Sequence, residues 1–277
     1  MTVAQTFTQV SPPRPLFDLP VYDLTWPDAL ALVNELTAQP AAHAHISFLN
    51  ANNANIMFGD PEYRAILGQH MVLPDGIGID IASLVLSGHR FSANLNGTDF
   101  VPAMLTYIEK SQRVGLIGGQ AHVLSAAAER FRRHSPWHQF IEISDGFFDK
   151  ADCGAVIAKI ERSNLDILLI GLGTPLQEKW IDRNIRQDHA RLVIGVGALF
   201  DFVSGNVARA PSWVRRLRGE WVYRLWLEPR RLWRRYLLGN PTFLWSVLRY
   251  RLGSRAAATP VATGQLPVEA PDKPQPR

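Results

Sequence analysis

The sequence predicts an α/β fold in which a mostly parallel sheet carries helices on both faces. Short segments of uninterrupted apolar residues alternate with longer amphipathic segments along most of the 277 residues. Strands that are buried on both faces have this continuous apolar character, and helices connect parallel neighbours. An apolar content of 47% is enough for a full core. Together these observations indicate a Rossmann-like core followed by a helical C-terminal appendage.

The first half of the chain alternates after an interrupted start. Residues 1–19 are expected to be irregular because prolines punctuate them. The apolar segment 45–49 predicts a strand, and 52–67, which begins among asparagines, predicts mostly helix. The elements expected after them are a short buried strand at 70–73 and helices at 77–86 and 98–110.

The second half continues the alternation without an internal repeat. The apolar run from Ile167 to Ile170 makes 166–171 the strongest strand, and the helix expected at 175–186 has Pro175 in its first turn, where a proline is tolerated. The other strands are expected at 114–117, which ends at two glycines, at 140–144 and at 191–196. The other helices are expected at 121–133, which is rich in alanine, and at 150–162.

The residues after position 205 differ in composition from the rest. Between positions 209 and 255 there are twelve arginines but two acidic residues, and five of the eight tryptophans lie there. Arg and Trp beside Leu are typical of helices on an anionic membrane surface, where each basic residue contributes about 1 kcal/mol. Nucleic acid is the competing anion, but the low Lys content favours the membrane. We expect helices broken near Pro229 and Pro241.

Composition also sets the expected domains and location. We expect an irregular segment at 1–19, a catalytic domain at 20–205, a membrane-associating appendage at 206–253 and a disordered tail at 254–277. The single cysteine excludes an intramolecular disulfide and a Cys-based zinc site. With no signal-peptide pattern and no run of 18 apolar residues, we expect a cytoplasmic protein, peripheral on the inner face of the cell membrane. The sequence leaves open whether the protein forms a homo-oligomer.

Asp75 is the leading candidate for a catalytic residue. It stands between the strand expected at 70–73 and the helix expected at 77–86, with Gly76 directly after it. Open α/β sheets bind their ligands at such strand ends, and a carboxylate at the floor of a pocket can act as a general base. Asp-Gly is also a common turn dipeptide, so this assignment depends on the other segments that agree with it.

Polar residues after two other strands are the next candidates. Asn52 is expected to be a helix N-cap, whereas Asn50, one step deeper, is expected to hydrogen-bond to substrate. Gln177 is expected in the first turn of its helix, where its amide would face the same edge as Asp75 and bind sugar hydroxyls. Glu178 beside it is explained by the helix dipole.

Two further segments have structural as well as functional interpretations. Gly118 and Gly119 close a strand before a helix, where free N–H groups can hold a pyrophosphate, although tight packing explains them equally well. Before the helix at 98–110, Thr98 is a plausible N-cap and Asp99 a first-turn acid. The sequence has no Asp-x-Asp motif, which is the usual holder of divalent cations in sugar-nucleotide enzymes, so no metal is expected.

Taken together, these segments resemble the WecG/TagA/CpsF glycosyltransferases, glycosyltransferase family 26. The resemblance covers about residues 20–250 in the right order. It is carried by Asn50, 74–78, 97–99, 118–119, 145–148, 171–180, 195–201, Gly205, 209–211, 220–221 and 223–224.

The resemblance implies an inverting, metal-independent enzyme without a cofactor, which transfers a hexose from a UDP-sugar to a polyprenyl-pyrophosphate-linked saccharide during exopolysaccharide or other cell-surface polysaccharide synthesis. It implies that Asp75 is the general base and that Gln177 contacts the donor or acceptor. The residues expected to bind substrate are Asn50, Asn52, Gly76, Asn94, Asp99, Gly118, Gly119, Gly173, Arg209 and Arg215.

Two departures from the family pattern affect these expectations. Phe48 and Asn94 stand where many members have Thr and Arg. The missing arginine is thought to help the pyrophosphate leave, so we expect Arg209, Arg215 or another arginine of the appendage to replace it. The alternatives are an NAD(P)-binding oxidoreductase that uses Gly118 and Gly119, and a non-enzymatic membrane-surface adaptor.

Overall fold

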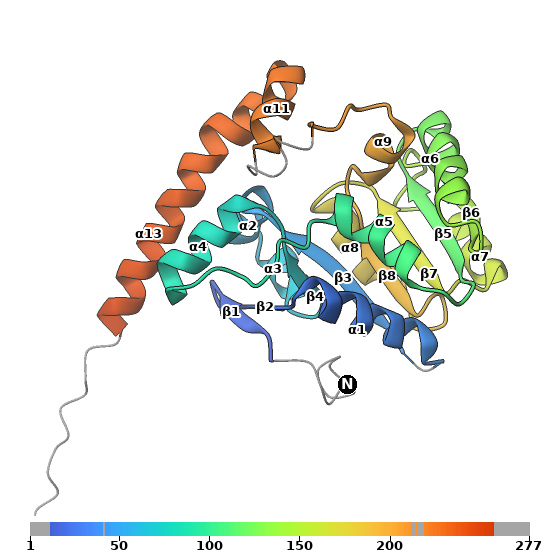
Figure 1. The fold of residues 1–277 in the computed structure, drawn as a ribbon, viewed down its shortest axis with the longest axis horizontal. Coiled ribbons are helices and arrows are strands. Elements are labelled where there is room, and N and C mark those ends of the chain that lie inside the picture. Colours follow the sequence, from blue (N-terminus) through green and yellow to red (C-terminus); the bar gives the residue numbers. More distant parts are fainter. Residues whose placement is uncertain (1–11, 41, 212–213, 215–218, 258–277) are drawn as a thin grey trace, which may run out of the picture.

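Figure 1 shows the computed structural model of the chain, which describes residues 12–40, 42–211, 214 and 219–257. Eight strands within these residues form one sheet in the order β1-β2-β4-β3-β8-β7-β5-β6. Neighbouring strands pair in parallel, apart from the antiparallel pair β1 and β2. The predicted α/β fold with a mostly parallel sheet is confirmed.

The strands are β1 (Arg14–Leu16), β2 (Leu19–Val21), β3 (Ala44–Leu49), β4 (Met71–Pro74), β5 (Arg113–Gly118), β6 (Gln139–Ser144), β7 (Ile167–Gly171) and β8 (Leu192–Gly195). The helices between them are α1 (Trp26–Ala38), α2 (Ala51–Gly59), α3 (Pro61–Leu67), α4 (Ile77–Ser87), α5 (Gly97–Tyr107), α6 (Ala121–His134), α7 (Gly154–Ser163), α8 (Leu176–Asn184) and α9 (Leu199–Ser204). The C-terminal elements are α11 (Glu220–Leu227), α12 (Pro229–Trp233), the π-helical η2 (Arg234–Leu238) and α13 (Gly239–Ala257).

Strands β3 to β8 each supply side chains to two helical layers, because successive residues of a strand point to opposite faces. In β7, Ile167 and Leu169 pack in the layer of α1, α5, α6 and α9. Leu168 and Ile170 pack on the opposite face, against α7 and α8. That face continues over β3 and β4, where α2, α3, α4 and α13 cover it. Both faces of the sheet are therefore buried, as the continuous apolar strands predict.

A crevice forms where neighbouring strands send the chain to opposite faces. After β3 the chain enters α2 on one face, and after the adjacent β8 it enters α9 on the other. Open α/β sheets bind ligands at such a switch point, at the carboxyl ends of the strands. The segments that follow β3 and β4 contribute to this crevice.

The C-terminal helices are anchored on the sheet by two buried side chains. Phe243 and Val247 of α13 pack in the same core cluster as Phe17, Met57 and Ile79. Polar contacts add to this packing: the Asn55 side chain donates to the carbonyl of Gly239 at 2.7 Å, and the Tyr250 hydroxyl donates to Asp18 at 2.6 Å. In Figure 1, α13 therefore runs along α4 and α2.

One of the two expected breaks in the C-terminal helices is present. The backbone of Glu228 is non-helical before Pro229, but helix continues from 229 to 257 through Pro241. A proline removes one hydrogen bond from a helix, and the π-helical turn Arg234–Leu238 lies immediately before the turn that contains it. The expected break near Pro241 is wrong.

The N-terminal segment also differs from expectation. Residues 14–21, within and beside the segment expected to be irregular, form a hairpin whose two-residue turn has positive φ at Phe17 and Asp18. Such turns normally use Gly or Asn. Here, Phe17 is held by edge-on ring contacts with Phe58, Phe243 and Tyr250, with centroids 5.0, 6.0 and 5.4 Å away. Tertiary packing therefore overrides the local preference.

Other differences concern helices. The helix expected at 52–67 is two helices, because Asp60 adopts an extended conformation and caps α3 by accepting from the Tyr63 N–H. The helix expected from residue 150 begins at Gly154, since Asp149 forms a turn with the N–H of Ala151. Helices α1 and α9 were not expected.

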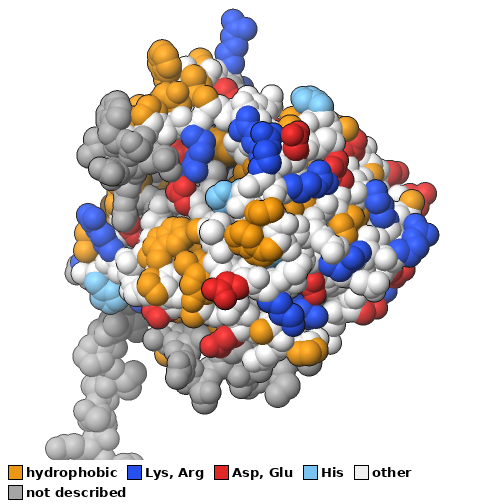
Figure 2. All heavy atoms as spheres, turned by 45° about the vertical axis from the view of Figure 1, so that its right-hand side comes forward, with side chains coloured by type: hydrophobic (Ala, Val, Ile, Leu, Met, Phe, Trp, Pro, Cys, Tyr) orange, Lys and Arg blue, Asp and Glu red, His pale blue; other side chains and the backbone are white. Residues whose placement is uncertain are grey.

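Charge is mixed on the side of the molecule formed by β6, α6 and α7. Figure 2 shows acidic and basic side chains interspersed there, and two of the pairs are Arg132 with Glu142 and Arg133 with Glu129. Among the described helices, none combines the length and the apolar character that crossing a bilayer would require.

Candidate active site

A pocket of about 610 Å³ lies at the carboxyl ends of β3 and β4, beneath the C-terminal helices. Its lining comes from four parts of the chain: the start of α2, the start of α4, the segment 94–99, and a C-terminal group made of α9, α11, η2 and α13. The charged residues among the lining are Asp75, Asp99, Glu220, Arg224 and Arg235. The pocket thus combines core strand ends with side chains of the appendage.

Asp75 lies at the floor of this pocket, directly after β4. Its N–H donates to the carbonyl of Leu49 at 2.8 Å, which ties it to the end of β3. Gly76 follows with φ 89°, a conformation that disfavours other residues, and its N–H donates to the Asn94 side chain at 2.7 Å. The backbone is therefore fixed on both sides of the carboxylate.

Burial raises the pKa of Asp75, and the hydrogen bond from Asn50 lowers it. Arg235 and Arg224 also lower it, whereas the carboxylate of Glu220 raises it. The net direction is upward, because desolvation of the charged form is the largest cause. A carboxylate with a raised pKa is a stronger base, which suits proton removal near neutral pH.

Asn50 has a double role. Its Oδ1 accepts from the Asn53 N–H at 3.0 Å, which makes it the N-cap of α2, and its Nδ2 donates to Asp75 Oδ2 at 3.2 Å. The expectation that Asn52 caps this helix is wrong. Asn52 lies in the first turn and lines the pocket instead. Asn50 therefore links the start of a helix to the candidate base.

The segment before α5 holds its polar side chains in place mainly through internal contacts. Asn96, not Thr98, is the N-cap of α5, and it accepts from the Asp99 N–H at 3.0 Å. Asp99 also accepts from the Asn96 side chain at 2.9 Å and pairs with Arg209 at 2.9 Å. Arg209 is therefore bound to Asp99 and is not among the pocket-lining residues. Arg215 lies outside the described residues.

The appendage contributes three charged side chains that were not among the predicted site residues, although two of them, Glu220 and Arg224, belong to the segments that carry the family resemblance. Glu220 and Arg224 come from α11, and Arg235 comes from η2. The guanidinium of Arg224 lies over the ring of Phe202 at 5.0 Å, which holds it above the pocket. The sequence signal was the arginine excess of this segment, which predicts a cationic contribution without saying which arginines face the site.

Gln177 is not in the pocket. It is 2% exposed; its Oε1 accepts from the Gly197 N–H at 3.0 Å and its Nε2 donates to Glu178 at 2.9 Å. The amide expected to bind substrate is thus used inside the protein, where it fixes the turn after β8. The expectation that Gln177 lines the same site as Asp75 is wrong.

Glu178 lies in the first turn of α8, as expected, and its side chain is turned into the interior. It is 1% exposed and accepts from the Thr174 hydroxyl at 3.0 Å as well as from Gln177. Burial raises the pKa of Glu178. Its neighbour across the helix interface, Tyr63, also has a pKa raised by burial. These buried groups lie where α3 packs against α8.

The glycines expected to bind pyrophosphate lie at the same edge of the sheet, with β8 and β7 between them and β3. Gly118 has φ 126°, and a Cβ there would meet the carbonyl oxygen of Gly171 at 2.3 Å, so close strand packing explains it. A Cβ at Gly119 (φ 67°) would be in ordinary contact with the Val123 side chain at 3.6 Å, whereas Gly173 (φ 82°) has open space beside it. The loop after β6 is held in place by a hydrogen bond from the Gly146 N–H to the Gly119 carbonyl. The next residue of the loop, Phe147, is 75% exposed.

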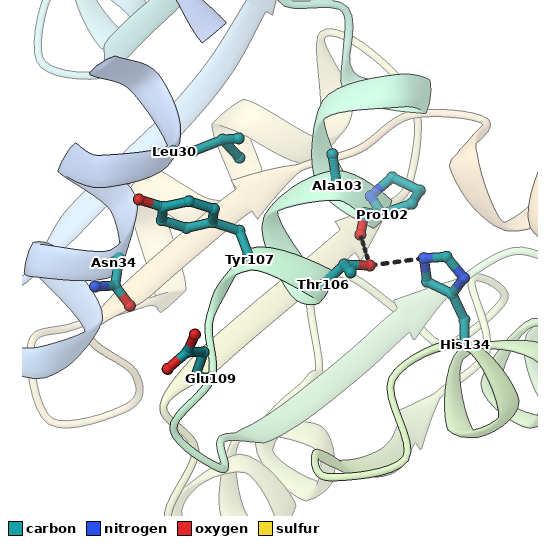
Figure 3. A pocket seen from close by; sticks show the side chains of 8 residues that line it. All are labelled: Leu30, Asn34, Pro102, Ala103, Thr106, Tyr107, Glu109 and His134. Carbon is teal, nitrogen blue, oxygen red and sulfur yellow. Dashed lines mark hydrogen bonds between the residues drawn. The ribbon is translucent and has the colours of Figure 1, made fainter. Parts of the chain in front are cut away.

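A second hollow, of about 860 Å³, lies between α1 and the C-terminal half of α5. Figure 3 shows Tyr107, Asn34 and Glu109 around it, with Thr106 bonded to His134. No candidate site residue lines it. Within the described part of the chain, no group of three or more His, Cys, Asp or Glu residues is arranged to hold a metal ion.

Comparison with known proteins identifies relatives of this chain. A family model described as the glycosyl transferase WecG/TagA/CpsF family matches residues 14–257. Two similar proteins are both named N-acetylglucosaminyldiphosphoundecaprenol N-acetyl-β-D-mannosaminyltransferase. The one from Bacillus spizizenii is 35% identical over 209 residues, which is 75% of this chain and 78% of the relative. The one from Bacillus subtilis is 36% identical over 209 residues, 74% of this chain and 79% of the relative.

Proposed function

Because this chain belongs to the WecG/TagA/CpsF family of glycosyltransferases, we propose that it transfers a hexose from a UDP-sugar to a polyprenyl-pyrophosphate-linked saccharide. The reaction is inverting and independent of metal, and it serves exopolysaccharide or other cell-surface polysaccharide synthesis. The names of the two Bacillus relatives describe a diphosphoundecaprenol-linked acceptor and transfer of N-acetylmannosamine. These names support the acceptor class and make UDP-N-acetylmannosamine the first donor to test.

The observation that carries the proposal is the setting of Asp75. Its partly buried carboxylate has a raised pKa and stands at the floor of a pocket large enough for a sugar. In the reaction Asp75 takes the proton of the acceptor hydroxyl while that oxygen bonds to the anomeric carbon. The bond from this carbon to the UDP oxygen breaks on the opposite side, so the configuration inverts and UDP leaves with the electron pair.

The arginines of the pocket suit a diphosphate group. Arg224 and Arg235 reach the lining from α11 and η2, and a guanidinium binds phosphate oxygens in a bidentate manner. Beyond them the pocket is walled by apolar side chains from α4 and α13, namely Ile77, Ile81, Pro241 and Leu244. We assign the acceptor diphosphate to the arginines and the first isoprene units to this wall.

We assign the donor nucleotide to the end of β5, at the same edge of the sheet as Asp75. The N-cap of α6, Gln120, makes no side-chain bond to the first turn, so N–H groups after Gly118 and Gly119 are placed to receive a phosphate. The exposed ring of Phe147 beside them offers a stacking surface for the uracil base. We propose that these groups hold UDP and stabilise its charge as it leaves.

The C-terminal helices are suited to an anionic membrane surface. They present large apolar side chains to solvent, among them Trp226 at 76% and Trp245 at 65% exposure, next to arginines. Burying apolar side chains in the headgroup region while arginines pair with lipid phosphates gives reversible attachment. We therefore propose that the enzyme is peripheral on the inner face of the membrane, where its lipid-linked acceptor lies.

Transfer assays test this proposal. Purified protein is incubated with a panel of UDP-sugars and a short polyprenyl-diphosphate N-acetylglucosamine, and the anomeric configuration of the product is read by NMR. We expect transfer with inversion, and we expect Asp75→Asn to lose about two to four orders of magnitude in turnover while UDP still raises its melting temperature. Near-normal turnover in Asp75→Asn, or stabilisation by NAD but not by UDP, contradicts the proposal.

A further inference from the structure

The pocket contains a charge conflict that the proposed reaction must resolve. Two guanidinium groups, from Arg224 and Arg235, suit a diphosphate, but each also stabilises the ionised form of Asp75. A carboxylate stabilised by cations is a weaker base, and its power to remove a proton falls accordingly. The same residues that bind the substrate therefore weaken the group that activates it.

Glu220 is placed to offset this effect. It is the first residue of α11 and lines the pocket that holds Asp75 at its floor. An acid in the first turn of a helix is also explained by the helix dipole, and the Gly219 cap provides no side chain of its own. The dipole accounts for an acid at this position, but not for its place in the lining of the pocket that also contains Asp75.

The groups that face Asp75 come from every element around it. Asn50 donates a hydrogen bond from the start of α2, and the segment 94–99 contributes Asp99, which is bonded to Asn96 and paired with Arg209. From above, α11 contributes Glu220 and Arg224, and η2 contributes Arg235. Of the two other carboxylates in the lining, Glu220 is the one whose charge raises the pKa of Asp75, against the effect of the arginines.

We infer that Glu220 is a positioning residue that keeps Asp75 an effective base beside the two arginines, so that removal of the acceptor proton depends on α11 being seated over the pocket. The inference rests on the proposed function and deepens it. It ties the chemistry to the packing of α11 over the pocket, because Glu220 reaches the lining from that helix.

The direct test is a titration of Asp75 that needs no substrate. Protein labelled with ¹³C at the aspartate carboxyl carbons is titrated by NMR, and the Asp75 signal is identified by its loss in Asp75→Asn. In Glu220→Gln we expect the midpoint of this signal to move to lower pH, because a nearby negative charge has been removed. In Arg235→Gln we expect the opposite displacement. Glu220→Asp retains the charge and is expected to titrate close to the original protein.

Glu228→Gln is the matched control. Glu228 directly follows the last residue of α11 and does not line the pocket. The substitution removes the same negative charge as Glu220→Gln. Its titration is expected to coincide with that of the original protein. If Glu220→Gln and Glu228→Gln give the same Asp75 midpoint, the inference is overturned.

Kinetics supply an independent readout. The acid limb of the kcat/KM profile reports the free enzyme, in which no substrate diphosphate yet neutralises the arginines. In Glu220→Gln this limb is expected to move to lower pH, and by more than the limb of kcat. Absence of transfer with every donor would contradict the proposed function, while the NMR titration would still decide the role of Glu220. Active transfer with an unmoved limb and an unmoved midpoint would refute this inference alone.

Discussion

Substitutions at Asn50 separate the stability of the fold from the strength of the base. The two ends of its amide serve different partners: Oδ1 caps α2 and Nδ2 bonds to Asp75. Asn50→Ala removes both contacts. Asn50→Ser keeps a good helix cap, because a serine hydroxyl accepts the same N–H, but it cannot donate to the carboxylate from the same distance.

The expected magnitudes follow from these contacts. Losing an N-cap costs about 1 kcal/mol, which in a domain of this size lowers the melting temperature by roughly 2–4 °C. We expect this loss in Asn50→Ala and little of it in Asn50→Ser. The bond from Asn50 lowers the pKa of Asp75, so both variants are expected to raise that pKa and move the acid limb of kcat/KM to higher pH.

Thermal unfolding at neutral pH and rate profiles between pH 4 and 8 provide the assays. Asn52→Ala is the stability control, since Asn52 lies in the same first turn and does not cap the helix. Equal destabilisation in Asn50→Ser and Asn50→Ala would refute the capping role. An acid limb that stays in place in both variants would refute the role of Asn50 toward Asp75.

Three further predictions concern buried polar groups. Gln177→Leu leaves the Gly197 N–H without its acceptor and should lower the free energy of unfolding by about 1–3 kcal/mol. UDP should still bind the folded fraction with unchanged affinity. A selective loss of UDP affinity would show instead that Gln177 contacts the substrate. Burial raises the pKa of Glu178 in the folded state, so its stabilising contribution is complete below the unfolded-state pKa and is lost as pH rises toward the folded-state pKa. Urea unfolding should therefore find Glu178→Gln more stable than the original protein at pH 8. The difference in stability should disappear near pH 4.5. Burial lowers the pKa of His45 to about 3 and that of His70 to about 4, so the free energy of unfolding should fall as pH drops from about 6.5 toward 4. In His45→Gln this fall should be less steep. Equal slopes of unfolding free energy against pH in the two proteins would contradict this prediction.

The sequence was most informative where local pattern and burial coincide. Strands such as β7 are continuous apolar runs, and each predicted strand is present within one or two residues. Asp75 and Asn50 were predicted as neighbours in one site, because parallel strands end at the same edge of the sheet. Their hydrogen bond agrees with that argument.

Side-chain direction was the part that the sequence did not determine. The first turn of α8 places Gln177 and Glu178 near the strand ends, but helix rotation turns both into the interior. Similarly, three nearby asparagines offered more than one cap for α2, and backbone geometry selected Asn50. Neither the direction of these two side chains nor the identity of the helix cap can be predicted from the order of residues alone.

The contributions of the appendage depend on long-range packing. Among the described arginines of the C-terminal segment, Arg209 pairs with Asp99, whereas Arg224 and Arg235 line the pocket. Composition predicted that this segment is cationic. Which members face the site follows from the docking of Phe243 and Val247, which brings η2 over the strand ends.

The hairpin turn at Phe17 connects the early residues of the chain to its last helix. Removing residues 14–21 would take away the ring against which Phe243 and Tyr250 rest, and with it one support of the pocket roof. An N-terminal deletion chosen to aid expression would then impair catalysis without touching any residue that contacts substrate. Shortened versions of this enzyme should therefore be designed with both ends treated as one structural unit.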